Sequence, residues 1–174
     1  MAARVVLIGP MAAGKTKIGK RIAKLIDAPR LDTDKIFVAE HGIIAEFFAR
    51  EGEPAFRAIE AAIVRDAIAT DSVVSLGGGA VLDEQSQQLL ADAYVVYLTV
   101  SPEAVAERLT EGKRPLVADE GVVAWERIFA ARKPIYERLA KRTYDTSRGN
   151  LDAIAEDIAA WIASGYTQEK RAGL

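Results

Sequence analysis

The sequence of 174 residues contains no cysteine, which excludes disulfide bonds and any metal site built on thiolates. It has one histidine, and without a second histidine or a paired nucleophile it gives no support for a hydrolytic triad. No run of about eighteen apolar residues occurs, and the N-terminus lacks the pattern of a secretory signal, so we expect no membrane partner. The net charge of −2 lacks the basic excess that a nucleic-acid partner requires. We therefore expect a cytoplasmic protein.

What the sequence does have is a strand, loop and helix pattern near its N-terminus. Residues 4–9 (RVVLIG) form a short apolar run, which is typical of a strand buried on both faces. Residues 9–16 (GPMAAGKT) match the spacing G-x-x-x-x-G-K-[ST] of a phosphate-binding loop, and apolar residues then recur at helical spacing. This context favours a nucleotide site over a helix-capping turn with a chance lysine.

Each position of this loop has an expected part in binding ATP. Backbone N–H groups of residues 11–16 would surround the phosphates at the positive end of the helix. Lys15 is expected to reach the β- and γ-phosphates, and the Thr16 hydroxyl to ligate Mg²⁺. We expect Ala12 to be tolerated because φ there can stay negative. The nucleotide-binding residues predicted in the loop are Gly9, Met11, Ala12, Ala13, Gly14, Lys15 and Thr16.

Alternating strands and helices continue along the chain and predict a three-layer α/β/α fold with a five-stranded parallel sheet. The further strands are expected within residues 29–34, 72–80, 94–100 and 142–146. A helix over 122–140 contains Pro134, which we expect to end or bend it. We predict one domain over residues 1–164, followed by a tail at 165–174 that lacks periodicity and should be disordered.

Carboxylates and glycines follow the second and third predicted strands. Asp32 and Asp34 alternate, so both can project into one cleft, although Asp34 is equally well placed to be the N-cap of the next helix. The glycines at 77–79 indicate close approach of the backbone to a ligand or to another segment. Because ligands bind beyond the carboxyl ends of parallel strands, these residues and the phosphate loop predict one site.

Three arginines in separate elements complete the candidate chemistry. Arg57, Arg114 and Arg132 could converge on an anionic acceptor and a γ-phosphate, because guanidinium groups bind carboxylate and phosphate bidentately. Each could also be a solvated surface residue, and Arg57 could pair with Glu60 one helical turn away.

The remaining conspicuous side chains are interpreted as structural. His41 precedes Gly42 and is interpreted as the last residue of a helix. Trp125 and Trp161 lie on amphipathic helices and are interpreted as packing residues.

Taken in order, these segments resemble the shikimate kinase family of P-loop kinases, from about Val5 to Ile162. The most specific are GEPAFRAIE at 52–60 and the triple glycine, accompanied by LDTD, RPL and ARKPIYERLA. The resemblance implies transfer of the ATP γ-phosphate to the 3-hydroxyl of shikimate, with Mg²⁺ as cofactor, in aromatic amino acid biosynthesis. ATP and shikimate would be the partners of a monomer.

The resemblance also implies roles for individual residues. Asp32 would hold a metal-bound water, and Asp34 would contact and deprotonate the acceptor hydroxyl. Helices within residues 33–60 would bind shikimate. The remaining substrate-binding residues would be Arg57, Gly77, Gly78, Gly79 and Arg132. Arg114 would belong to a lid at about 112–120 that closes over the γ-phosphate, while Arg108 and Arg148 would contact adenine.

The chain departs from the family pattern at three places. Ala12 stands where the family usually has glycine, Phe37 stands where an acidic residue is common, and the adenine loop lacks a proline after Asn150. These changes bear on nucleotide affinity, because no charged catalytic group is lost. The alternatives are a P-loop kinase of another small acceptor, such as gluconate or a nucleoside monophosphate, and a degenerate nucleotide-binding paralogue. A GTPase switch is disfavoured because no N-K-x-D motif is present.

Overall fold

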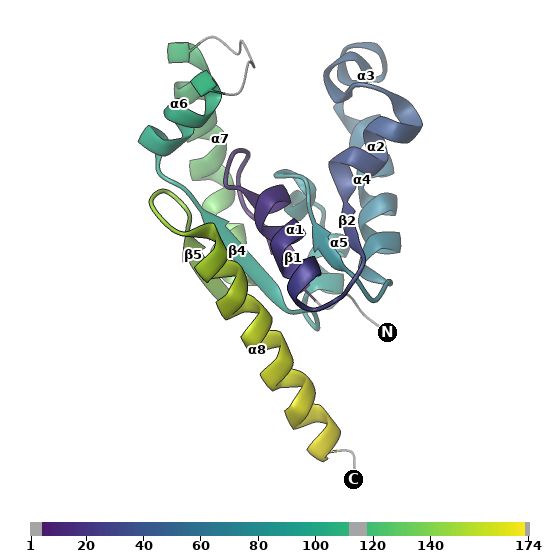
Figure 1. Cartoon of the computed structure of the whole chain (residues 1–174). Helices are drawn as coiled ribbons and strands as arrows, with labels where there is room; N and C mark the ends of the chain where they lie inside the picture. Colours follow the sequence, from purple (N-terminus) through teal and green to yellow (C-terminus); the bar gives the residue numbers. More distant parts are fainter. Residues whose placement is uncertain (1–4, 112–117, 173–174) are drawn as a thin grey trace.

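The computed structural model describes residues 5–111 and 118–172, and its centre is a five-stranded parallel sheet (Figure 1). The strand order is β2-β3-β1-β4-β5, and each neighbouring pair is parallel. The strands are β1 (Val5–Ile8), β2 (Arg30–Asp32), β3 (Val73–Ser75), β4 (Val95–Thr99) and β5 (Arg142–Asp145). The predicted five-stranded parallel sheet is confirmed.

Helices cover both faces of this sheet (Figure 1). They are α1 (Lys15–Leu25), α2 (Thr33–His41), α3 (Ile44–Glu51), α4 (Glu53–Ile68), α5 (Glu84–Leu90), α6 (Pro102–Glu111), α7 (Ala118–Leu139) and α8 (Leu151–Ala172), with a short 3₁₀ helix at Ala80–Leu82. Helices α1 and α8 pack together on one face, and α4, α5 and the C-terminal part of α7 lie on the other. Within the described residues, no helix is long and apolar enough to cross a membrane.

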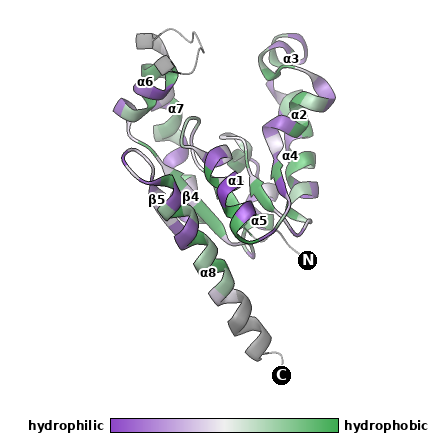
Figure 2. Cartoon of the chain, in the orientation of Figure 1, coloured by the Kyte–Doolittle hydropathy of each residue, from purple (hydrophilic) through white to green (hydrophobic). Residues whose placement is uncertain are grey.

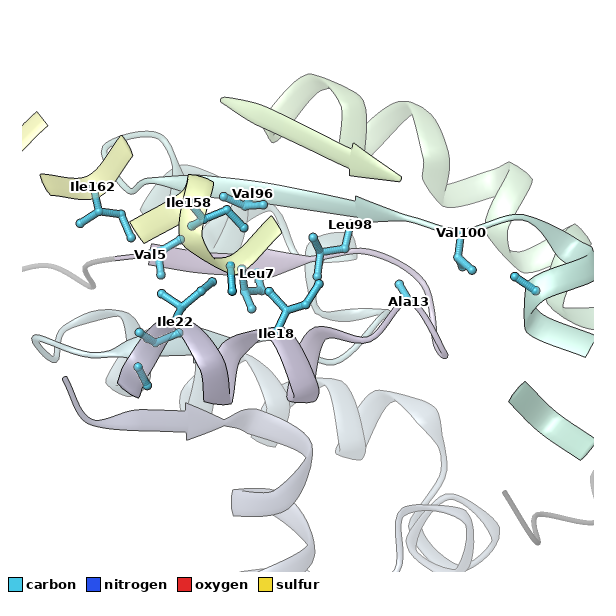
Figure 3. Packing of buried hydrophobic residues seen from close by; sticks show 14 of the residues in the cluster. Val5, Leu7, Ala13, Ile18, Ile22, Val96, Leu98, Val100, Ile158 and Ile162 are labelled. Carbon is cyan, nitrogen blue, oxygen red and sulfur yellow. The ribbon is translucent and has the colours of Figure 1, made fainter. Parts of the chain in front are cut away.

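The central strand β1 is apolar throughout because its successive side chains enter two different cores. Val5 and Leu7 of β1 pack with Ile18, Ile22 and residues of α8 (Figure 3). Their neighbours Val6 and Ile8 pack against the opposite layer. All four β1 side chains are buried. Figure 2 accordingly shows the central strand β4 as mainly hydrophobic, with hydrophilic residues on loops and on outward-facing turns of the helices.

A third, smaller core lies away from the sheet. Phe37 of α2, Phe47 of α3 and Phe56 of α4 form it, with ring centroids 5.1 Å apart for Phe37 and Phe47 and 4.8 Å apart for Phe37 and Phe56. Phe37, which stands where the related pattern has an acidic residue, therefore has a packing function. His41 ends α2 beside this cluster, as expected for a helix-terminal residue.

One helix contains a proline that does not end it, and another runs further than the sequence suggests. Helix α7 continues through Pro134 to Leu139, so the proline does not end it. Helix α8 continues to Ala172, and the segment that we expected to be disordered from residue 165 is helical up to that point. Most of the predicted lid, including Arg114, lies outside the described residues.

Candidate functional site

The phosphate loop joins the end of β1 to the start of α1. Gly9 has φ of 140°, and a side chain there would overlap the carbonyl oxygen of Leu98 on β4. Gly14, with φ of 87°, precedes α1 directly, which leaves the N–H groups of the first helical turn facing the loop. The structure thus has the geometry that the motif predicts.

Ala12 is a correction to the prediction for this loop. Its φ is 66°, in the left-handed region, whereas we expected a negative value. A residue with a Cβ pays about 1–2 kcal/mol for that conformation, which is the physical reason for a glycine at this position in related loops. The loop therefore contains backbone strain that the surrounding contacts must offset.

Lys15 is folded back onto its own loop. Its Nζ donates hydrogen bonds of 2.8 Å to the carbonyl oxygens of Gly9 and Pro10. Burial lowers the pKa of Lys15 to about 8, although the carboxylates of Asp34 and Asp32 act in the opposite direction. An anion in the loop would supply the compensating charge.

Thr16 and Asp32 form an oxygen pair suited to a hard cation. The Thr16 hydroxyl donates a 2.8 Å hydrogen bond to Oδ2 of Asp32. Asp32 also caps α2 by accepting from the Lys35 N–H at 3.3 Å. The cap is therefore Asp32, and the alternative that placed Asp34 in that position is wrong.

The three glycines after β3 each face one of the predicted charged residues. A Cβ on Gly77 would lie 2.5 Å from Oδ1 of Asp34, and a Cβ on Gly78 would lie 3.6 Å from Nη1 of Arg132. A Cβ on Gly79 would overlap the guanidinium group of Arg57. The absence of side chains on the turn is thus what allows the two arginines and the carboxylate to gather around it.

Thr33 connects the end of β2, which leads to Asp34, with the end of β3, which leads to the glycine turn. Its buried Oγ1 accepts a 3.0 Å hydrogen bond from the Gly77 N–H and donates to the Ser75 carbonyl at 3.5 Å. The carboxylate-bearing end of β2 is thereby held in register with the glycine turn after β3.

Asp34 has the electrostatic environment of a candidate base. The surrounding protein partly removes it from water and so raises its pKa, and the nearby charge of Asp32 adds to the effect. Lys15 and Arg57 act in the opposite direction, which shows that these four charges are close enough to interact.

Arg57 is held by two carboxylates on its own helix. Its Nη1 lies 2.5 Å from Oε2 of Glu60, and its Nη2 lies 3.2 Å from Oε1 of Glu53. The Glu60 side chain is only 8% exposed, and burial raises its pKa against the opposing effect of Arg57. The predicted alternative of a helix ion pair is therefore correct in its geometry, but Glu60 is buried, Arg57 is partly buried, and both lie against the glycine turn.

The two arginines predicted to contact adenine are placed differently. Arg108 donates a 2.6 Å hydrogen bond to the Ala12 carbonyl and further bonds to Thr146, at the loop after β5. Arg148 in that loop is exposed, and its charge acts on Glu103 at the start of α6. Arg108 thus contacts the phosphate loop directly.

The site matches a known family in sequence and in structure. The family model for shikimate kinase matches residues 11–163. The chain belongs to the shikimate kinase family. A shikimate kinase of Rhodococcus jostii is 40% identical over 170 residues, which cover 94% of this chain and 99% of the relative. One of Mycobacterium tuberculosis is 41% identical over 163 residues, or 91% of this chain and 92% of the relative.

Solved structures give the same picture for this shikimate kinase family member. The shikimate kinase of Acinetobacter baumannii, in complex with shikimate, superposes with a TM-score of 0.85 at 28% identity, covering 95% of this chain and 94% of that one. A gluconokinase from Sinorhizobium meliloti gives 0.63 at 20% identity, over 94% of this chain and 95% of that one, a likeness of fold alone.

Sequence reasoning missed several residues that shape the site of this family member. Thr33 lies between the two predicted aspartates, and Tyr136 donates to the Gly78 carbonyl from four residues beyond Arg132. Trp125, which we interpreted as a packing residue, also donates a 3.0 Å hydrogen bond to the Met11 carbonyl. A signal existed for Glu60, through its spacing from Arg57, whereas nothing in the sequence indicated these three contacts.

Proposed function

We propose that this protein is an ATP-dependent shikimate 3-phosphotransferase. The observation that supports it is the pairing of the glycine turn with Asp34, Arg132 and Arg57, beside a complete phosphate loop. Two guanidinium groups suit the carboxylate of shikimate, and a carboxylate between them and the loop suits a hydroxyl. The bound shikimate in the Acinetobacter baumannii structure is consistent with this acceptor.

The chemistry would be an in-line phosphoryl transfer that depends on positioning and charge neutralisation. Asp34 would orient the 3-hydroxyl and accept its proton, and a pKa raised by burial makes it a better base than a solvated aspartate. Lys15 would leave the Gly9 and Pro10 carbonyls to bind the β- and γ-phosphates. Arg57 and Arg132 would hold the shikimate carboxylate, and we propose that Arg114 approaches the γ-phosphate.

The residues present fit a Mg²⁺ ion. The Thr16 hydroxyl and the Asp32 carboxylate are adjacent hard oxygen ligands, with Asp32 placed to act through a water. Mg²⁺ in kinases is held by one or two protein oxygen ligands together with the substrate phosphates and water, so this pair of residues is sufficient. The ion would neutralise charge that develops on the phosphates.

We further propose that the protein acts in the cytoplasm, as a monomer, in aromatic amino acid biosynthesis. ADP release from MgATP, measured with and without shikimate, tests the activity and the acceptor together. Gluconate and a nucleoside monophosphate serve as alternative acceptors in the same assay. The proposal predicts turnover with shikimate only, and no turnover at millimolar shikimate would reject it.

A further inference from the structure

Side chains from the C-terminal half of the chain hold three consecutive carbonyl groups of the phosphate loop. Trp125 Nε1 donates to the Met11 carbonyl at 3.0 Å, Arg108 to that of Ala12 at 2.6 Å, and Thr146 Oγ1 to that of Ala13 at 2.8 Å. Because the carbonyl and N–H of one peptide plane point in opposite directions, holding the carbonyls outward turns the N–H groups toward the phosphate position.

Two of these donors bracket the strained residue. The Met11 carbonyl belongs to the peptide plane before Ala12, and the Ala12 carbonyl belongs to the plane after it. Trp125 and Arg108 therefore restrain the two planes whose rotation sets φ and ψ of Ala12. A left-handed alanine persists only where its surroundings determine its conformation, and these hydrogen bonds do so.

Trp125 differs from Lys15 and Arg108, which also donate to the loop, because binding of nucleotide does not require it to move. Lys15 is expected to leave its carbonyls for the phosphates, and Arg108 is expected to contact adenine. The Trp125 ring is 4% exposed and stacks on Phe129, with centroids 4.9 Å apart and an interplanar angle of 27°. Its indole N–H is thus a fixed donor aimed at the loop.

Helix α7, which carries Trp125, also carries Arg132, one of the residues proposed to bind shikimate. Arg132 lies seven residues later on α7, hence on the same helical face, and approaches Gly78. The Met11 N–H group adjoins the same glycine, since its nitrogen would lie 3.6 Å from a Cβ there. Helix α7 therefore carries both the donor to the phosphate loop and Arg132, which we propose binds the acceptor.

We propose that Trp125 is a positioning residue for the nucleotide, which acts through its hydrogen bond to the Met11 carbonyl. The kinetic consequence rests on the proposed function, whereas the binding consequence does not. Trp125→Phe removes the N–H and keeps an aromatic ring against Phe129. We expect the dissociation constant of MgADP, measured by calorimetry, to rise about three- to tenfold, the range for one lost hydrogen bond.

Trp161→Phe is the matched control, because the chain has only two tryptophans and Trp161 packs on Tyr94 from α8. This control variant should bind MgADP like the wild type. In Trp161→Phe, Trp125 is the sole tryptophan, so the fluorescence of this variant should change on addition of MgADP. The fluorescence of Trp125→Phe comes from Trp161 alone and should not change.

KM values and the unfolding temperature distinguish a positioning role of Trp125 from a general loss of packing around it. With Trp125→Phe, the KM for ATP should rise by the same factor as the dissociation constant, and the KM for shikimate should stay within about twofold. An unchanged MgADP dissociation constant despite a lower unfolding temperature would make Trp125 purely structural and overturn the proposal. So would an equal rise of both KM values. A wild type that binds MgADP without phosphorylating shikimate would reject the proposed function while leaving the binding comparison decisive.

Discussion

At the scale of single residues, Ala12 offers the most direct test of strain in the phosphate loop. Ala12→Gly relieves the cost of a left-handed Cβ but adds flexibility to the unfolded chain, so we expect unfolding free energy to rise by up to about 1 kcal/mol. The KM for ATP should be unchanged, because the wild-type loop already has this conformation. Chemical denaturation and steady-state kinetics measure the two effects.

Ala13→Gly is the control for that substitution. Ala13 is fully buried in the core beneath the loop, so the same change there should lower the unfolding free energy by about 1 kcal/mol. If both glycine variants were destabilised to the same extent, the strain assigned to Ala12 would be refuted.

Asp34 is the residue on which the chemical step depends most. Asp34→Asn keeps the shape of the side chain but removes the base, so we expect kcat to fall about a hundredfold or more. MgADP affinity should not fall, because the substitution removes a negative charge close to Lys15 and so removes repulsion of the phosphates. Single-turnover kinetics test the first expectation and calorimetry tests the second. Near-normal turnover would remove Asp34 from the role of base.

Lys15 makes nucleotide binding depend on pH. Its pKa in the empty site is lowered to about 8 by burial, below the usual 10.5, so at pH 9 the amine is mostly neutral. Bound phosphates stabilise the ammonium form and raise the pKa again, so MgADP binding at pH 9 should take up a proton. At pH 6.5 Lys15 is already charged, and its contribution to uptake should vanish.

Calorimetry in two buffers of different ionisation enthalpy measures that uptake. At pH 9 the observed enthalpy should differ between the buffers in the direction of proton uptake. Identical enthalpies at pH 9 would mean that Lys15 is charged in the empty protein.

At the scale of elements, Thr33 links the end of β2 to the turn after β3. Thr33→Val keeps the shape of the side chain but leaves the buried Gly77 N–H without its acceptor, so we expect a loss of about 1–3 kcal/mol in unfolding free energy. Thr33→Ser retains the hydroxyl and should lose clearly less. Equal losses in the two variants, measured by urea denaturation, would show that the methyl group matters rather than the hydrogen bond.

The elements themselves were largely predictable, because strands β1 and β4 are apolar and almost wholly buried, and helices such as α1 have a clear apolar period. The helix predicted over 122–140 is present as part of α7, and Pro134 does not end it. The contacts of Trp125 and Thr146 with the phosphate loop could not be predicted, since more than a hundred residues separate the partners. The left-handed Ala12 was missed for the same reason, because the side chains that hold it come from distant elements.

At the scale of the whole molecule, the helices that carry Asp34 and Arg57 pack around a hydrophobic core of their own. Phe37, Phe47 and Phe56 pack apart from the sheet. Within the described part of the chain, α4 alone contributes buried residues both to this cluster and to the core behind the sheet. Helix α3 packs on α2 and α4, and has a single buried residue, Phe47. A unit with so little buried surface should open locally without unfolding the sheet.

Hydrogen exchange followed by mass spectrometry tests this division. Amides of α3 (Ile44–Glu51) should exchange much faster than those of β1 and β4, whose side chains are buried on both faces. Shikimate should slow exchange in α2 and α3, because it would link Asp34 on α2 to Arg57 on α4 and so close the small core around Phe37. Helix α8, which lies on the far side of the sheet from that core, should be unaffected and serves as the internal control. Exchange of α3 at the rate of β1 would mean that the two cores unfold as one unit.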